Sequence, residues 1–174
     1  EGELLHSAVE PTGAFACSNE LYNRLQDMLV WTQRSNMFSV QSDCPHRERF
    51  AYGGDIVATS EAFLMNFDMA GFYAKTVRDW SDAARPDGNF TDTAPFVGIQ
   101  YCGVGWAMVH PLLIEQLYQH YGDRRLLEAY LRLIPLRRIA QPEEIAKLAI
   151  FLVSDPASYL TGSTFDATGG MISR

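Results

Sequence analysis

The densest cluster of charged side chains in this chain lies between Asp43 and Asp55. It places three carboxylates and two guanidiniums around a proline turn: Asp43, Glu48 and Asp55, with Arg47 and Arg49. Cleavage of a glycosidic bond commonly uses one carboxylic acid to protonate the leaving oxygen and a second carboxylate to activate water or attack carbon. Aromatic residues, which make up 12% of the chain, suit the walls around a sugar ring. These residue types favour a sugar-cleaving site.

Glu48 is the candidate proton donor of this cluster. Its neighbours Arg47 and Arg49 favour the charged form of the carboxyl, which is the wrong form for an acid. Side chains in an extended segment alternate between two sides, so Glu48 is able to face away from both arginines. Convergence of Asp43 and Asp55 on Glu48 would favour the protonated form by like-charge repulsion. The alternative from spacing alone is a solvated ion-pair network that holds the loop.

Hydrophobic periodicity predicts the elements that position this cluster. A helix begins after Ser18 or Asn19, both good N-caps, and its apolar stripe consists of Leu21, Leu25, Met28, Leu29 and Thr32. Residues 35–55 break the period and are predicted to form a loop that holds the cluster. Further helices are expected over residues 56–66, residues 69–84, a segment that ends at Tyr121-Gly122, and residues 124–133. A last helix begins at Gln141-Pro142, and a turn into a short strand follows over residues 159–165.

Composition limits the class of ligand and partner. The net charge of -7 and the pI near 5.0 disfavour nucleic acid and anionic membranes, and leave neutral or polar small molecules open. The three cysteines have no paired spacing, so they predict buried free thiols rather than a zinc site or a disulfide framework. The four histidines show no ligand spacing either, and no metal or other cofactor is expected.

Several segments in and around the cluster resemble the α-L-rhamnosidases of glycoside hydrolase family 78. Residues 43–49, Asp-Cys-Pro-His-Arg-Glu-Arg, are similar to the signature of that family, and Tyr52-Gly53-Gly54-Asp55 resembles its continuation. Further segments resemble the family in order and separation: Phe15–Asn19, Trp31–Asn36 and Tyr121–Asp123. The resemblance covers about residues 5–130. It implies a mainly α fold, namely part of the (α/α)6 toroid of six-hairpin glycosidases, over residues 1–132.

The resemblance also implies a role for each residue of the site. Glu48 would be the general acid, and the residues that bind rhamnose hydroxyls would be Asp43, Arg47 and Asp55. Tyr52 stands where many family members carry tryptophan, and Trp106 resembles a tryptophan that walls the sugar subsite; both are taken as substrate-binding residues. A core aromatic at the head of a helix is the alternative for Trp106. The implied ligands are glycosides that contain rhamnose.

The end of the chain resembles a different family. Residues 134–171 are similar to the C-terminus of short-chain dehydrogenases/reductases, through segments such as Arg138–Ala146 and Tyr159–Gly162. Residues 167–170 depart from the Val-Asp-Gly-Gly of that family. The sequence has neither a Gly-x-Gly-x-x-Gly turn nor a Tyr-x-x-x-Lys pair, so this tail is not expected to bind NAD or to move hydride. The expected domains are a partial rhamnosidase barrel, residues 1–132, and a dehydrogenase-like tail, residues 133–174.

These features predict an α-L-rhamnosidase-like hydrolase module of limited turnover. The family inverts at the anomeric carbon, which needs a second carboxylate across the ring, and in the family that base lies beyond the similar region. The later acids Glu115 and Glu128 lie on predicted helices with surface roles. The alternative is a non-catalytic module that binds rhamnose and associates with itself through apolar faces that half a toroid leaves uncovered. An oxidoreductase is the third and least favoured alternative. The sequence leaves open whether the protein is cytoplasmic or secreted.

Overall fold

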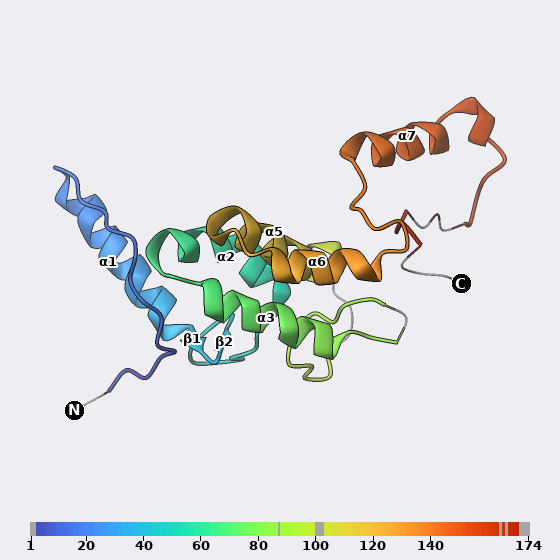
Figure 1. The fold of residues 1–174 in the computed structure, drawn as a ribbon. Helices are drawn as coiled ribbons and strands as arrows, with labels where there is room; N and C mark the ends of the chain where they lie inside the picture. The colour runs from blue at the N-terminus through green and yellow to red at the C-terminus, as the bar shows by residue number, and fades with distance from the viewer. Residues whose placement is uncertain (1–2, 87, 100–102, 164, 166, 171–174) are drawn as a thin grey trace. The chain divides into compact units, whose positions relative to one another are not determined.

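The computed structural model describes residues 3–86, 88–99, 103–163, 165 and 167–170, and it is mainly helical (Figure 1). The chain divides into two compact units, Glu1–Asp123 and Arg124–Arg174. This structural division falls after Asp123, whereas the family boundary expected after residue 132 stays a prediction. None of the described helices is long and apolar enough to cross a bilayer.

The first unit carries five helices and a small hairpin among its described residues. In chain order they are α1 (Glu20–Ser35), β1 (Met37–Phe38), β2 (Val40–Gln41), α2 (Gly53–Asn66), α3 (Ala70–Ala83), α4 (Val104–Ala107) and α5 (Val109–Tyr121). The second unit contains α6 (Arg124–Leu133), α7 (Pro142–Leu152) and a short 3₁₀ helix, η1 (Asp155–Ala157). The mainly α class inferred from the sequence is confirmed.

Helix α1 begins where its capping residues predict. Asn19 is the N-cap, and its side-chain oxygen accepts a hydrogen bond of 3.0 Å from the backbone N–H of Leu21. This bond satisfies one of the donors that the first turn of a helix leaves unpaired. The next residues differ from the expected loop, because β1 and β2 pair in antiparallel register with Ser39, at a φ of 65°, between them.

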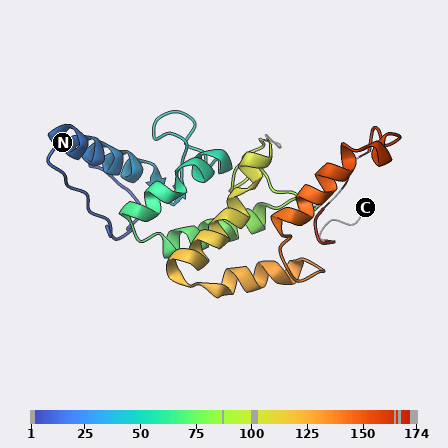
Figure 2. The same ribbon diagram turned by 90° about the horizontal axis from the view of Figure 1, so that it is seen from above.

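The core of the first unit lies between α2, α3 and α5. Helix α3 packs against α5, and α2 packs against α4 and α5, an arrangement that Figure 2 shows from above. The predicted face of α3 is buried throughout: Phe72, Tyr73, Val77 and Trp80. Pro111 lies in the first turn of α5, where a missing N–H is tolerated. Gly122 ends that helix in the left-handed conformation, as its sequence position predicts.

Two expectations about buried or extended residues are wrong. Cys17 is exposed and Cys44 is half-buried, because each thiol lies in a polar loop rather than on an apolar face; Cys102 lies outside the described residues. The described part of residues 159–170 forms no strand. A strand needs a neighbour to satisfy its backbone groups, and the described residues of the second unit supply none. The backbone instead folds back, and Leu136 N–H donates to the carbonyl oxygen of Gly169 at 3.2 Å.

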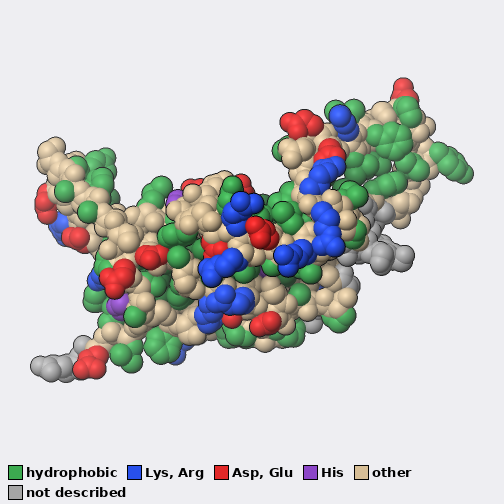
Figure 3. Space-filling view, in the orientation of Figure 1, with side chains coloured by type: hydrophobic (Ala, Val, Ile, Leu, Met, Phe, Trp, Pro, Cys, Tyr) green, Lys and Arg blue, Asp and Glu red, His purple; other side chains and the backbone are tan. Residues whose placement is uncertain are grey.

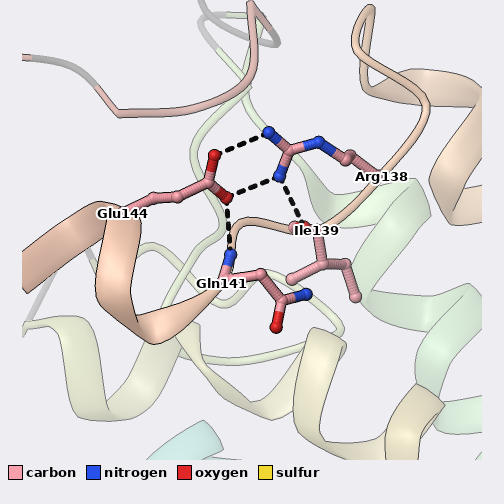
Figure 4. A network of polar contacts seen from close by, with 4 residues as sticks. All are labelled: Arg138, Ile139, Gln141 and Glu144. Carbon is pink, nitrogen blue, oxygen red and sulfur yellow. Dashed lines mark hydrogen bonds and ion pairs between the residues drawn. The ribbon is translucent and has the colours of Figure 1, made fainter.

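A local ion pair holds the entry of α7 (Figure 4). The Arg138 guanidinium donates from Nη1 and Nη2 to the two carboxylate oxygens of Glu144, at 2.6 Å each. Glu144 Oε2 also accepts from the backbone N–H of Gln141 at 2.8 Å, and Pro142 occupies the first turn, as predicted. The hydrogen bonds from Arg138 first, and that from Gln141 second, lower the pKa of Glu144 to about 2. The helix therefore begins through contacts that are local in sequence.

Replacing Arg138 with glutamine should raise the pKa of Glu144 from about 2 toward its ordinary value of 4.5. Because this pKa is lowered in the folded chain, the stability that the pair contributes is present above pH 4.5 and is lost as pH falls toward 2. Titration of the ¹³C carboxyl signal of Glu144 measures the shift. Arg137→Gln is the matched control, since the Arg137 guanidinium contacts the carbonyl oxygen of Arg132, and it should leave the Glu144 titration unchanged.

Candidate active site

The segment between β2 and α2 is a closed loop that carries Arg47 and Glu48, and it stands out from the helices in Figure 2. Asp43 closes this loop in two ways. Its backbone N–H donates to the carbonyl oxygen of Phe50 at 3.0 Å, and its Oδ1 accepts from the N–H of Phe50 at 2.9 Å. Cys44 Sγ accepts from the N–H of Glu48 at 3.2 Å, within the loop. Hydrogen bonds thus close the backbone of this loop, while residues 45–49 are exposed to solvent.

The first turn of α2 brings Asp55 to the same place. The helix begins at Gly53, three positions before the predicted start at residue 56, so Asp55 lies within its first turn. The Gly53 N–H donates to the carbonyl oxygen of Asp92 at 2.8 Å, which ties the helix start to the segment before α4. Tyr52 is the N-cap and forms a backbone bridge with Thr93.

Trp106 lies against this first turn because two glycines leave room for it. A Cβ on Gly53 would lie 2.1 Å from the carbonyl oxygen of Trp106, and a Cβ on Gly54 would lie 2.6 Å from its indole ring. No side chain larger than hydrogen fits at either position without displacing α4. The Trp106 side chain remains 37% exposed, so it is not enclosed as an ordinary core aromatic. Its assignment as a wall of the sugar site stays a prediction.

The charges of Asp43 and Glu48 act on Asp55. Burial, first, and then the negative charge of Asp43 raise the pKa of Asp55 above its ordinary value; the charge of Glu48 adds a smaller rise, and a backbone hydrogen bond opposes it. Asp43, Tyr52 and Asp55 are half-buried, whereas Arg47 and Glu48 are exposed. The fold therefore gathers the carboxylates that the sequence grouped, and the carboxyl with the raised pKa is that of Asp55.

A pocket of about 400 Å³ opens beside this cluster, between α1 and α2. Polar and apolar residues share its lining: Thr32, Gln33, Asn36, Gln41, Ser42, Asp43, Asp55 and Thr59, with Leu29, Ala62 and Phe63. Among the predicted site residues, Asp43 and Asp55 belong to this lining, while Arg47, Glu48, Tyr52 and Trp106 lie outside it. Hydroxyl, amide and carboxylate groups of this kind suit a neutral ligand that is rich in hydroxyls.

The neutral polar residues of this pocket were not predicted from the sequence. Gln33 is 4% exposed, and neither polar atom of its amide has a hydrogen-bond partner among the described residues. Ser42 Oγ donates to Asn36 Oδ1 at 3.0 Å, and Thr59 Oγ1 donates to the carbonyl oxygen of Asp55 at 2.6 Å. A signal was present for some of them, since Gln33 and Asn36 belong to the Trp31–Asn36 segment and Thr59 lies one helical turn after Asp55.

A second pocket, of about 370 Å³, lies within the second unit. Its lining is largely apolar, with Ile134, Leu136, Ile139 and Ile145, and none of the predicted site residues belongs to it. The two charged side chains in the lining, Arg138 and Glu144, are bonded to each other. This pocket offers no group that is arranged for acid–base chemistry.

Neutralising one acid at a time should reveal how the cluster is coupled. Asp43→Asn and Glu48→Gln should each lower the pKa of Asp55, and Asp43→Asn should lower it more, because the charge of Asp43 has the larger effect. The amide oxygen of asparagine is able to accept the bond from Phe50, so the loop stays closed. The measurement is a ¹³C titration of the Asp55 carboxyl, with the exposed Glu61→Gln on α2 as control. Equal effects of all three variants would contradict a cluster of interacting acids.

Comparison with known proteins matches the chain to two family models. Residues 10–135 match the family model described as bacterial alpha-L-rhamnosidase 6 hairpin glycosidase domain. Residues 104–172 match the model described as enoyl-(acyl carrier protein) reductase, and the two matches overlap over residues 104–135. The tail is also 50% identical, over 46 residues, to a 3-oxoacyl-[acyl-carrier-protein] reductase of Chlamydia trachomatis; this covers 26% of the chain and 18% of the relative. The resemblance of the tail to short-chain dehydrogenases/reductases is thereby confirmed.

The rhamnosidase relatives are much longer than this chain. An alpha-L-rhamnosidase of Streptomyces avermitilis is 37% identical over 128 residues, which cover 72% of the chain and 12% of the relative. Among solved structures, alpha-L-rhamnosidase from Dictyoglumus thermophilum has a TM-score of 0.70 and 39% identity, with 73% of the chain and 15% of that structure covered. The Streptomyces avermitilis enzyme complexed with L-rhamnose has a TM-score of 0.67 and 32% identity, with 78% and 14% covered.

The fold, the closed acidic loop and the similarity in sequence thus agree over the greater part of the molecule. The matched residues 10–135 make up well over half of the chain. The chain belongs to the bacterial α-L-rhamnosidase six-hairpin glycosidase family.

Proposed function

We propose that this chain binds a terminal α-L-rhamnosyl group at the Asp43–Asp55 cluster, in a site built for acid-assisted, inverting hydrolysis. Glu48 protonates the glycosidic oxygen, and Asp43, Arg47 and Asp55 hold the hydroxyls of the sugar. Tyr52 and Trp106 contact the ring. The observation that carries the proposal is the placement of Asp43, on the closed loop, and Asp55, at a helix start, in the lining of one pocket, with Glu48 near enough for its charge to raise the pKa of Asp55. The solved relative complexed with L-rhamnose supports the choice of sugar.

The exposure of Glu48 agrees with the role of a proton donor. A general acid must come within hydrogen-bond reach of the oxygen that it protonates, and an exposed side chain is accessible to the leaving group of a bound sugar. Asp43 and Asp55 are less exposed than Glu48 and line the pocket, where hydroxyls of a bound ring would be gripped. In this arrangement Glu48, the more exposed acid, takes part in the chemistry, and Asp43 and Asp55 bind the sugar.

Turnover by these 174 residues alone is expected to be low. An inverting enzyme needs a second carboxylate on the far side of the ring, roughly 6.5–9.5 Å from the acid, with room for a water molecule. Glu115 on α5 is exposed and accepts a hydrogen bond from Gln119 at 2.9 Å. Glu128 on α6 pairs with Arg124 at 3.4 Å. Both later acids have the i,i+4 surface partners that their positions predict, which speaks against a catalytic base at either.

Titration with L-rhamnose tests the binding half of the proposal. We expect weak, saturable binding that Arg47→Met weakens at least about tenfold, since a hydrogen bond to a charged group is worth about 1.5–3 kcal/mol. Calorimetry or ¹⁵N-resolved NMR of the whole chain measures the dissociation constant. Arg78→Met, which removes an exposed arginine from α3, is the matched control. Aryl α-L-rhamnoside hydrolysis should be at least about a hundredfold slower than in a full-length relative, because acid–base groups contribute about 10²–10⁴ in rate.

The binding result and the rate result have separate meanings. Equal loss of binding in Arg47→Met and Arg78→Met would remove the proposed site. A rate equal to that of full-length relatives, abolished by Glu48→Gln, would keep the site and contradict the expected low turnover.

A second candidate function, self-association, is favoured by the surface of α1. Its large apolar side chains are between 39% and 63% exposed: Leu21, Tyr22, Leu25, Met28, Leu29 and Trp31. Leu21, Leu25 and Met28 recur at helical spacing and form one stripe. Hydrophobic side chains lie at the surface of both units in Figure 3. Exposed apolar stripes of this kind commonly mark protein contacts, and a second copy of this chain offers a stripe of the same chemistry.

Light scattering coupled to size-exclusion chromatography tests this candidate. The chain should elute as a dimer or larger, and Leu25→Lys, which puts a charge in the middle of the stripe, should shift it to monomer. Asp27→Asn on the same helix changes the net charge by the same amount outside the stripe, and it should leave the mass unchanged. A monomeric wild-type chain at high micromolar concentration would rule out association through α1.

A further inference from the structure

Gln41 is a buried polar side chain between the two halves of the candidate site. It ends β2, lies two residues before Asp43 in the chain and is 2% exposed. Both polar groups of its side-chain amide form hydrogen bonds. Nε2 donates to Thr59 Oγ1 at 2.8 Å, and Oε1 accepts from the hydroxyl of Tyr73 at 3.0 Å. Buried amides are kept where both groups find partners, so this side chain is held in one orientation.

The hydrogen bonds of Gln41 continue to Asp55. The hydroxyl of Thr59, which accepts from Gln41, donates in turn to the carbonyl oxygen of Asp55 at 2.6 Å. The path Tyr73–Gln41–Thr59–Asp55 therefore joins α3, β2 and the first turns of α2. Burial holds the pKa of Tyr73 well above its usual range, so its hydroxyl remains a proton donor over the accessible pH range.

The opposite side of the loop entry is fixed as well. Ser42, between Gln41 and Asp43, donates from its backbone N–H to the carbonyl oxygen of Asn36 at 2.9 Å. Its hydroxyl donates to Asn36 Oδ1 at 3.0 Å. The peptide that leads into Asp43 is thus tied to the end of α1 on one side and, through Gln41, to α2 and α3 on the other. A backbone movement of residues 41–42 relative to α1, α2 or α3 must break one of these bonds.

We propose that Gln41 is a positioning residue whose buried amide sets the separation of Asp43 and Asp55 across the pocket. Like charges repel, so two carboxylates that share a site drift apart unless the backbone beneath them is held. Gln41 supplies that restraint through α2 and α3: it belongs to the pocket lining, but both polar groups of its amide are bonded within the fold. Its relevance for rhamnose binding rests on the function proposed above, whereas the restraint itself does not.

A double-mutant cycle on the titration of Asp55 tests this role. Gln41→Met keeps the volume of the side chain and removes both hydrogen bonds, so Asp43 is able to move away and the pKa of Asp55 should fall. The fall should be smaller than the one caused by Asp43→Asn. In the Asp43→Asn background, Gln41→Met should lower the pKa of Asp55 much less, because the charge of Asp43 is gone and only the smaller effect of Glu48 remains.

Two further variants serve as a control and as a substitute for Gln41→Met. Gln116→Met on α5 removes another buried glutamine, 6% exposed, and it should leave the Asp55 titration unchanged. If Gln41→Met does not fold, Thr59→Val breaks the same path at an exposed position, and it should reproduce the cycle. A pKa of Asp55 that does not respond to either variant, or that falls equally with and without the Asp43 charge, would overturn the proposal.

The titration with L-rhamnose separates this inference from the proposed function. Absence of rhamnose binding together with an intact cycle would remove the function and keep the positioning role. Rhamnose binding together with a failed cycle would keep the function and remove the positioning role. With both correct, Gln41→Met should weaken rhamnose binding, and Gln116→Met should not.

Discussion

The candidate site depends on holding like charges together against their repulsion. Asp43, Glu48 and Asp55 come from one loop and one helix start, and burial and mutual repulsion raise the pKa of Asp55. A raised pKa means that the folded chain binds more protons than the unfolded chain, so this group makes folding less favourable as pH rises through its titration. The two bonds between Asp43 and Phe50 and the buried amide of Gln41 hold the backbone against that repulsion. The charged form of Asp55 thus lowers the stability of the fold, as is common where carboxylates are brought together in functional sites.

Local signals in the sequence predicted the helices well, because those helices begin and end through local contacts. Asn19 caps α1, Gly122 ends α5, and α6 has the predicted bounds. The strand expected over residues 159–165 failed for the opposite reason, since a strand requires a partner that no local pattern reveals. Periodicity also identified the apolar stripe of α1, although it does not say whether anything covers that stripe. The exposure of Leu21 and Met28 is a property of the tertiary structure.

The candidate site shows the same division. The residue types and order of Asp43, Glu48 and Asp55 favoured a sugar-cleaving site, and the resemblance to rhamnosidases implied the sugar; both stay predictions. What no pattern contained was the support beneath them. Gln41 and Thr59 are distant in sequence from each other, and their hydrogen bond exists only after β2 and α2 have packed. In the second unit, the ion pair between Arg138 and Glu144 holds the start of α7 through contacts that are local in sequence. This helix therefore forms although the described residues of the unit contain no strand.

Gly53 and Gly54 determine how closely Trp106 approaches the first turn of α2. Their hydrogens let the carbonyl and the indole of Trp106 approach the helix that bears Asp55, closer than any β-carbon permits. The close packing of Trp106 on the helix that bears Asp55 therefore depends on two residues that have no β-carbon. A chain with alanine at either position must move Trp106 away from the first turn of α2, even when every charged residue is the same.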